Sequence, residues 1–216
     1  MIRDLLRILF KLAMWFGGLL LLFIGVVLFS ILVYIEFAGN YLISENEKLE
    51  IFEEIGSAKE LPQLFYETNE QYFPESYNSS LWPCFFKYYF LNKRCHPESL
   101  QVSRQLYLAI KRKQDPNLTF MAVFKRFDPA AVARLIEKNI AKKKCYTFRM
   151  RSSSYGDNTR NLEEGSKAHF NKTIEELNET EVLGLHIIEK APTMYNPKRN
   201  PTKYQERLTA LIKAHK

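Results

Sequence analysis

The chain is poor in the residues that β-hairpins and disulfide scaffolds require. It has 8 glycines, 9 prolines and 3 cysteines among 216 residues. Tight hairpin turns need glycine or asparagine at positive φ, and such turn signals are scarce here. The sequence also has no internal repeats and no low-complexity tracts, which argues against a solenoid or a repeat array. A mainly α-helical domain is the fold class that remains.

Several common chemistries are missing as well. The chain has no Gly-rich phosphate loop, no nucleophile elbow and no Cys/His zinc pattern. Its 4 histidines lack metal-ligand spacing, and His186, inside an apolar stretch, is predicted to be a satisfied core residue. The three cysteines form no disulfide framework. Either Cys84 and Cys95 pair in an oxidising compartment and leave Cys145 unpaired, or all three are thiols.

One long apolar segment is present. Residues 12–35 carry no charge, and a helix of that length spans about 36 Å, enough to cross a hydrocarbon core of about 30 Å. The residues before it are mainly basic and those directly after it are mainly acidic. The positive-inside rule therefore puts residues 1–11 in the cytoplasm and residues 36–216 outside it. A cleaved signal peptide is the alternative, but its apolar region is about 7–15 residues long and no clean A-x-A site follows here.

The charge balance points to the kind of partner. With 31 Lys+Arg against 24 Asp+Glu the net charge is +7. A basic domain tethered beside a membrane favours anionic lipid headgroups or a phosphorylated lipid substrate, and nucleic acid is not expected there. Sequons of the N-x-S/T type would indicate a glycosylated type II membrane protein in a eukaryotic host and mean nothing in a bacterial one. They lie at Asn78, Asn117, Asn171 and Asn178.

The part of the chain after the apolar segment is predicted to be a juxtamembrane segment, 36–60, and one helical domain, 61–216. Asp128 followed by Pro129 gives the clearest helix start, an N-cap before proline at N1. Residues 179–191 are apolar nearly all round, which predicts a central core helix that ends at Pro192. Helices are expected over 61–73, 97–113, 129–144, 179–191 and 201–214.

Residues 81–91 are crowded with aromatic side chains. They form either a buried core segment or a segment that dips into the membrane interface, where aromatic rings concentrate. The side chains predicted to contact the membrane are Trp82, Phe85, Phe86, Tyr88, Tyr89 and Phe90.

A second cluster is basic. It either binds pyrophosphate or anionic lipid, or is a solvated helix end whose cations face the C-terminal dipole. Its members are Lys142, Lys143, Lys144, Arg149 and Arg151.

The C-terminal half carries a series of motifs in order. Residues 155–197 contain degenerate forms of Y-G-x-N, G-A-A-x-x-Y-F-G-K, L-x-x-x-E-A-A-x-L-A and A-P-x-x-Y-N-P, and Arg207 falls on the arginine of an N-P-x-x-x-x-x-R tail. Upstream, residues 133–156 and 99–106 continue the series. In these motifs the chain resembles the peptidoglycan glycosyltransferase domain, glycosyltransferase family 51, over about residues 60–214. The matching positions include Tyr155, Gly156, Asn158, Gly165, Ala168, Phe170, Lys172, Leu177, Glu181, Ala191, Pro192, Tyr195, Asn196 and Pro197.

The resemblance implies a lysozyme-like, mainly helical fold that lies on the outer face of a bacterial inner membrane. It implies lipid-linked disaccharide-peptide or nascent glycan as ligand, other cell-wall synthesis proteins as partners, and room for a Mg²⁺ ion although the sequence identifies no metal ligands. The residues that it marks for substrate binding are Gln105, Lys125, Arg126, Glu137 and Lys142.

The catalytic positions depart from the family. Glycosyl transfer needs a carboxylate that takes the proton of the acceptor hydroxyl, and the resemblance places that base at Asn69, where an amide cannot do so. The second family carboxylate falls on Pro129, and the lysine expected after the S-T-I-T-Q-Q motif falls on Leu108. Glu70, Glu67 and Asp128 are the remaining candidates for a relocated acid or base.

Three functions stay open at this point. The first is a glycosyltransferase-like protein that binds lipid-linked glycan with weak or lost catalysis. The second is an active transglycosylase with a relocated base, and the third is a glycosylated eukaryotic type II membrane protein of unrelated function.

Overall fold

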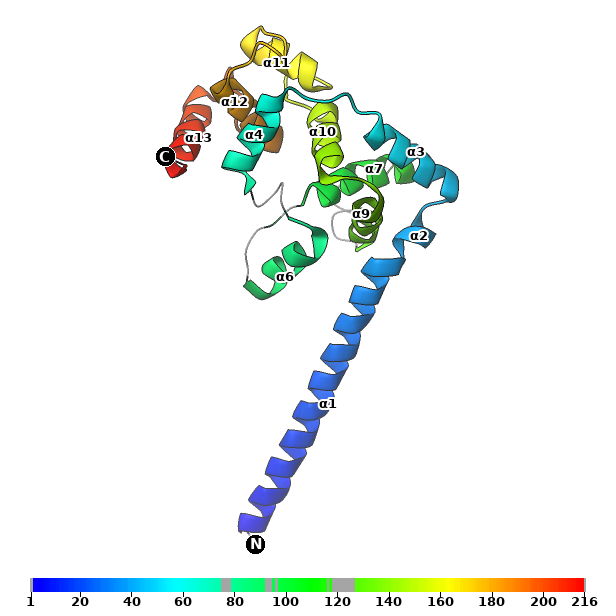
Figure 1. Ribbon diagram of the computed structural model, residues 1–216. Coiled ribbons are helices and arrows are strands. Elements are labelled where there is room, and N and C mark those ends of the chain that lie inside the picture. The colour runs from blue at the N-terminus through cyan, green and yellow to red at the C-terminus, as the bar shows by residue number, and fades with distance from the viewer. Residues whose placement is uncertain are drawn as a thin grey trace.

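In the computed structural model the described residues are 2–74, 79–91, 95, 97–115, 117 and 127–215. Within these ranges the chain forms helices and no β-strand, as predicted. One long helix projects from a helical domain (Figure 1). In chain order the helices are α1 (Ile2–Phe37), α2 (Gly39–Leu42), α3 (Glu45–Gly56), α4 (Gln63–Tyr72), α6 (Leu81–Leu91), α7 (Glu98–Gln114), α9 (Asp128–Asn139), α10 (Lys142–Ser152), α11 (Leu162–Phe170), α12 (Glu179–Lys190) and α13 (Pro201–Ala214).

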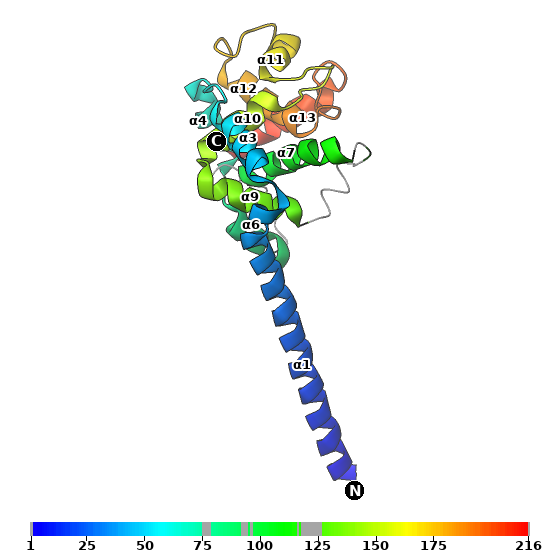
Figure 2. The same ribbon diagram turned by 90° about the vertical axis from the view of Figure 1, so that its right-hand side faces the viewer.

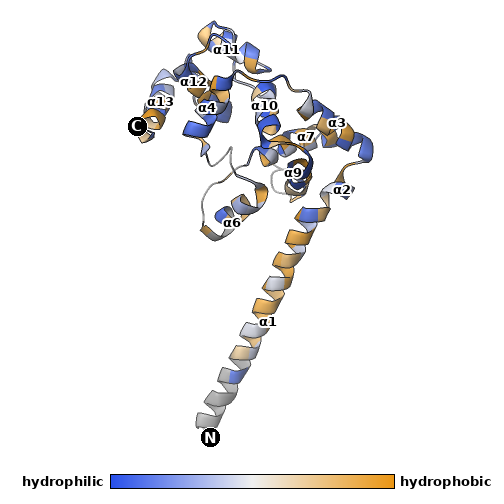
Figure 3. Cartoon of the chain, viewed as in Figure 1, coloured by the Kyte–Doolittle hydropathy of each residue, from blue (hydrophilic) through white to orange (hydrophobic). Residues whose placement is uncertain are grey.

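The helix α1 contains the apolar segment. Residues Met14–Phe37 are long and apolar enough to cross a membrane, within two residues of the predicted bounds. Most side chains of this stretch are exposed, and Figure 3 shows the apolar colour running along the helix. The rest of the protein gathers at the C-terminal end of α1 in both ribbon views (Figures 1 and 2).

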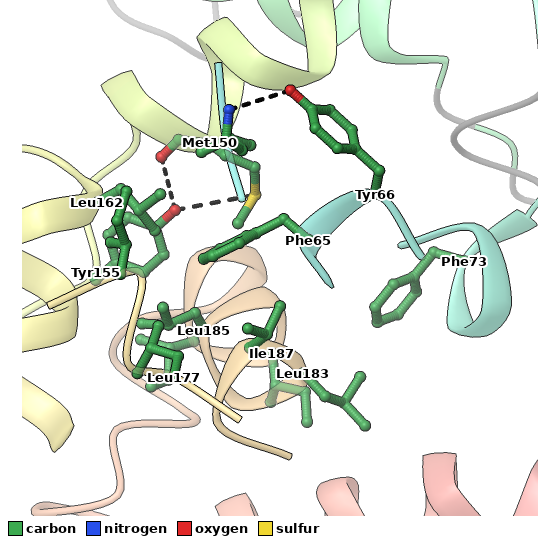
Figure 4. Close-up of a cluster of buried hydrophobic side chains, with 14 of the residues drawn as sticks. Phe65, Tyr66, Phe73, Met150, Tyr155, Leu162, Leu177, Leu183, Leu185 and Ile187 are labelled. Carbon is green, nitrogen blue, oxygen red and sulfur yellow. Dashed lines mark hydrogen bonds between the residues drawn. The ribbon is translucent and has the colours of Figure 1, made fainter. Parts of the chain in front are cut away.

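Two hydrophobic cores meet at α10. The first is built by α4, α10, α11, α12 and α13 around Phe65 and Tyr155, and Figure 4 shows the Phe65 ring pointing into the space between Met150 and Leu185. The second is built by α3, α7, α9 and the opposite side of α10, which contributes Cys145. Because α10 contributes to both cores, all of its residues from 145 to 150 are buried.

The expected helix over 129–144 is wrong in its extent. The structure has two helices there, because α9 ends at Asn139 and Ile140 adopts an extended conformation, with φ −124° and ψ 133°. The Asn139 side chain donates to the carbonyl of Leu135 and so satisfies the last turn. Ile140 is β-branched, which favours the extended state, and it packs against the second core. The other four predicted helices are confirmed to within about two residues.

The prediction for His186 is confirmed in its main point. The ring is fully buried in the first core region, where its Nε2 and the Tyr146 hydroxyl share a hydrogen bond of 2.9 Å. Burial, followed by the charges of Arg149 and Lys190, lowers the pKa of His186 well below its ordinary value. The imidazole is therefore neutral, and its Nδ1 has no hydrogen-bond partner in the described part of the chain.

The joint between α1 and the domain is short and polar. Tyr34 of α1 donates to Asp128 of α9 at 2.6 Å, and Glu36 pairs with Arg134 and with Lys138, each at 2.8 Å. One residue separates α1 from α2, where a Cβ on Gly39 would lie 2.5 Å from a backbone oxygen of α9. Only glycine fits this approach, so α9 lies directly against the end of the long helix.

We expect Gly165→Ala to destabilise the domain. Gly165 lies inside α11, and a Cβ there would come within 2.6 to 2.8 Å of the buried Tyr155 side chain, whose hydroxyl is fixed by the Met150 carbonyl. Overpacking of this kind costs about 1–3 kcal/mol, offset by about 1 kcal/mol of helix propensity. Thermal unfolding of the two proteins measures the difference. Gly56→Ala is the matched control, since its Cβ meets nothing within 4 Å, and an equal effect of both changes would contradict the prediction.

The cysteines adopt the first predicted arrangement, one disulfide and one free thiol. Cys84 and Cys95 form a disulfide, and Cys145 is a buried free thiol. Burial, with smaller contributions from Glu98 and Glu137, raises the pKa of Cys145 to about 12. Since the thiolate is the reactive form, we expect no rapid alkylation of the native protein at pH 8, one modified cysteine after unfolding and three after unfolding with reductant. Mass spectrometry counts the adducts, and fast labelling of the native protein would show that this arrangement is wrong.

Candidate functional site

A pocket lined by charged and polar side chains over a largely apolar surface lies between α7 and the C-terminal end of α10. Its volume is about 570 Å³, and Glu189 near the end of α12 closes one side. The lining residues are Gln101, Arg104, Gln105, Leu108, Ala109, Arg112, Arg149, Ser152, Ser153, Ser154 and Glu189.

The spacing of α7 explains why one helix supplies most of this wall. Gln101, Arg104, Leu108 and Arg112 follow one another at intervals of three and four, so they share one face of the helix. The opposite face carries Val102 and other apolar residues into the second core. The pocket wall therefore presents two arginines, one on each side of the apolar Leu108.

A buried ion cluster forms the floor. The Arg149 side chain is 4% exposed; its Nε lies 2.5 Å from one oxygen of Glu98, and its Nη1 lies 2.6 Å from Glu189. Glu189 also accepts a hydrogen bond from Ser153. Burial alone would lower the pKa of Arg149, but Glu189 and Glu98 outweigh it and raise that pKa well above its ordinary value. The cluster, which we call the Arg149 triad, joins α7, α10 and α12.

Among the predicted substrate-binding residues, Gln105 lies in this pocket, where its amide nitrogen donates to the Ser152 hydroxyl at 3.2 Å. Glu137 lies elsewhere and accepts hydrogen bonds of 2.7 Å from the Leu81 backbone and the Ser99 hydroxyl, which is a structural arrangement. Lys142 is exposed at the start of α10. The predicted residues Lys125 and Arg126 fall outside the described residues.

The predicted base position is enclosed. Asn69 is 1% exposed in α4, and its amide nitrogen has no hydrogen-bond partner in the described part of the chain. Glu67 and Glu70 are exposed on the same helix and do not belong to the pocket lining. These three residues therefore do not line the pocket that contains Arg104 and Arg112.

The interpretation of Asp128 as a helix N-cap is wrong. Phe127 occupies that position, and Asp128 is the first helical residue with no side-chain capping bond. Its two oxygens instead accept hydrogen bonds from the hydroxyls of Tyr34, at 2.6 Å, and Tyr107, at 2.9 Å. A carboxylate held by two tyrosines joins three helices, and the buried Pro129 beside it has no acidic group to offer.

The helix-end interpretation of the basic cluster is wrong for its three lysines, whereas Arg149 and Arg151 do lie in the last turn of α10. Lys142, Lys143 and Lys144 form the first turn of α10, the end at which the helix dipole disfavours cations. Glu60 compensates, because it pairs with Lys143 at 3.0 Å and with Lys144 at 3.1 Å. Arg149, from the same sequence cluster, is buried in the triad. The sequence cluster is thus divided among separate environments.

The aromatic segment forms α6, beside the end of α1. Its Leu81 and Cys84 are buried, and the Trp82 indole donates to Glu36 at 3.1 Å. Phe86 is 47% exposed, whereas Phe85 is half-buried. One side of α6 is therefore core and another is open. The side chains of Tyr88, Tyr89 and Phe90 lie outside the described residues.

The Transglycosylase family model matches residues 99–216, which is more than half of the chain. The chain belongs to the transglycosylase family. The match starts in α7 and includes every helix that lines the pocket, and it argues against a protein of unrelated function. No curated protein matches the chain.

A transglycosylase domain has a lysozyme-like helical fold, and membership supports a peptidoglycan glycosyltransferase-like function for this chain. The match does not reach α4, so the assignment of Asn69 to the base position stays a prediction. Sequence reasoning missed Arg104, Arg112 and Glu189 as pocket residues. The spacing of Arg104, Leu108 and Arg112 was a usable signal for the first two.

The residues of the pocket do not fit a Mg²⁺ site. Magnesium binds oxygen ligands, above all carboxylates, and Glu189 is the pocket carboxylate among the described residues, held by Arg149 and Ser153. Over the same part of the chain no three His, Cys, Asp or Glu side chains converge. No step is therefore assigned to a metal, and the chemistry that remains is recognition of an anion by arginines and hydroxyls.

Proposed function

We propose that this transglycosylase-family protein binds pyrophosphate-linked glycan precursor or nascent glycan at the outer surface of a bacterial inner membrane, with weak or lost polymerase activity. The pocket beside α7 supports the proposal most directly. It combines Arg104, Arg112 and the hydroxyls of Ser152–Ser154 over an apolar patch. Guanidinium groups suit phosphate oxygens because they donate in a planar fork.

The arginines have a specific relation to the family pattern. The family lysine on this helix corresponds to Leu108, and Arg104 and Arg112 lie one turn before and one turn after it. Both line the same pocket as Leu108. We infer that they supply the positive charge that this position itself lacks.

Loss of catalysis is supported by the groups at the two carboxylate positions. Asn69 is an amide, and it is buried; Pro129 has no acidic group. An amide cannot accept the proton of an acceptor hydroxyl at any useful pH. Asp128, the carboxylate next to Pro129, is engaged by two tyrosines.

Anchoring and topology rest on three features. The apolar span Met14–Phe37 has a basic N-terminal flank, α6 presents its exposed Phe86 near the end of that span, and the Cys84–Cys95 disulfide suits an oxidising compartment. We infer a single-pass protein whose N-terminus is cytoplasmic and whose domain is extracytoplasmic. Other cell-wall synthesis proteins are the partners that this placement favours.

A polymerisation assay tests the proposal. Purified full-length protein is incubated in detergent with lipid-linked disaccharide-peptide, with and without Mg²⁺; glycan polymer is read on gels and binding is measured in parallel. We expect saturable binding without polymer. Absence of both would overturn the proposal and leave only an inherited fold.

Polymer formation would instead favour an active enzyme with a relocated base. The observation that keeps this alternative open is the exposure of Glu70, next to Asn69 in α4. The variants Glu70→Gln and Glu67→Gln should then separate, one inactive and the other normal. If both keep full activity, neither residue is the base.

A further inference from the structure

A second hollow lies away from the pocket, where α1 meets the start of α9. Its volume is about 530 Å³. We call it the junction groove; five of its residues come from the C-terminal half of the apolar span and two from the start of α9. The lining residues are Val26, Val27, Ser30, Ile31, Tyr34, Phe127 and Asp128.

The polar groups of the groove are satisfied within the protein. The Ser30 hydroxyl donates to the carbonyl of Val26 at 2.8 Å. Asp128 accepts from Tyr34 and Tyr107, so both of its oxygens are engaged. Polar groups that face hydrocarbon must make their hydrogen bonds within the protein, as these do. The groove therefore offers apolar contacts to an occupant, and a sugar or a headgroup would find no partner there.

The exposed surface of the groove agrees with this. Val26 is 55% exposed and Phe127 is 41% exposed, although both are apolar. The Phe127 side chain lines the groove opposite the α1 residues, so a narrow apolar occupant would contact both walls.

The length of the groove limits what it can hold. Residues 26–34 rise about 12 Å along α1, which is close to one leaflet of a hydrocarbon core about 30 Å thick. The start of α9 closes it at the top. Gly17, Gly18 and Gly25 give no G-x-x-x-G pair for packing against a second copy of α1. A hydrocarbon chain fits this length and needs no such motif.

We propose that the junction groove seats one acyl chain of an anionic phospholipid. The proposal rests on the membrane anchoring proposed above and is independent of glycan binding. Residues 36–216 hold 28 Lys+Arg against 23 Asp+Glu, and this net charge of +5 favours anionic over zwitterionic lipid at the level of the headgroups. The bound chain fills the space between anchor and domain and adds to the polar contacts of the joint.

Photolabelling in vesicles tests this. Full-length protein is placed in phosphatidylcholine vesicles that contain phosphatidylglycerol with a mid-chain diazirine, and adducts are mapped by mass spectrometry. We expect adducts to concentrate on Val26, Val27, Ser30, Ile31 and Phe127, which line the groove, over Phe29 on the other side of α1. In Val27→Trp the indole ring should occupy part of the groove. It would displace one or two methylene groups of the acyl chain, which should lower the groove adducts about five-fold. Leu28→Trp, outside the groove, is the matched control.

Each remaining outcome overturns a stated part of the proposal. Even labelling around α1 overturns the site. Equal labelling by a phosphatidylcholine diazirine overturns the anionic preference. Sedimentation of the protein with the vesicles in carbonate is measured first. If the protein no longer sediments, both the anchoring and the groove are overturned. If it sediments but α1 is labelled evenly, only the groove is overturned.

Discussion

Replacing Arg149 by methionine should unfold the domain more readily than any exposed charge substitution. The change leaves Glu98 and Glu189 buried without their cation, with side-chain exposures of 2% and 10%. Removing one partner of a buried ion pair costs about 3–5 kcal/mol. For a domain of this size the midpoint of thermal unfolding should fall by about 6–20 °C. Circular dichroism of the full-length protein in detergent measures the shift.

Two controls separate the buried charges from general damage. Arg199→Met removes an arginine that pairs with Asp157 at 2.8 Å while 65% exposed, so it should cost no more than about 1 kcal/mol. The triple change Glu98→Gln, Arg149→Met and Glu189→Gln removes all three charges and should recover much of the lost stability, because no unpaired charge stays buried. A triple variant less stable than Arg149→Met would show that the triad is not the source of the effect.

Neutralising both pocket arginines should abolish most of the affinity for lipid-linked disaccharide-peptide. Each charge-assisted hydrogen bond to a phosphate is worth about 1.5–3 kcal/mol. Arg112 is exposed and Arg104 is half-buried, so the lower end applies. Arg104→Gln with Arg112→Gln should weaken binding by about two orders of magnitude. Binding of the fluorescent lipid-linked precursor to full-length protein in detergent measures the loss, and its salt dependence should become shallower.

The matched control is Lys203→Gln with Lys213→Gln. It makes the same change in net charge on α13, on residues that are exposed and outside the pocket. Affinity should be nearly unchanged in the control. Equal weakening by the two double variants would mean that net charge alone attracts the ligand, and the pocket would lose its assignment.

The helices could be predicted because their signals are local. Apolar periodicity and proline positions predicted α7, α12 and α13 closely, and the uncharged run predicted the apolar span of α1. The break at Ile140 was missed because its cause is tertiary: the residue packs against the second core in an extended conformation. The motif series identified the family correctly, since it rests on several dispersed positions in order.

The site was less predictable, because the partners of a side chain are set by distant segments. Asp128 and Pro129 look like a capping signal. The Asp128 carboxylate instead accepts a hydrogen bond from Tyr34, which lies 94 residues away in sequence. Arg149 looks like part of a basic cluster, but Glu98 and Glu189 come from two other helices. Gln105 could be predicted because it belongs to the motif itself.

The polar joint at the end of α1 also has a mechanical consequence. Only Ala38 separates α1 from α2, and the contacts of Glu36 with Arg134 and Lys138 hold α9 against that end. These contacts hold the domain rigidly against the end of α1. With α1 in a bilayer, as proposed above, any tilt of the helix would rotate the whole domain and change the height of the pocket above the lipid. On the same proposal, the glycans within reach of the domain would be set by lateral diffusion of the anchor and by the tilt that the bilayer thickness allows.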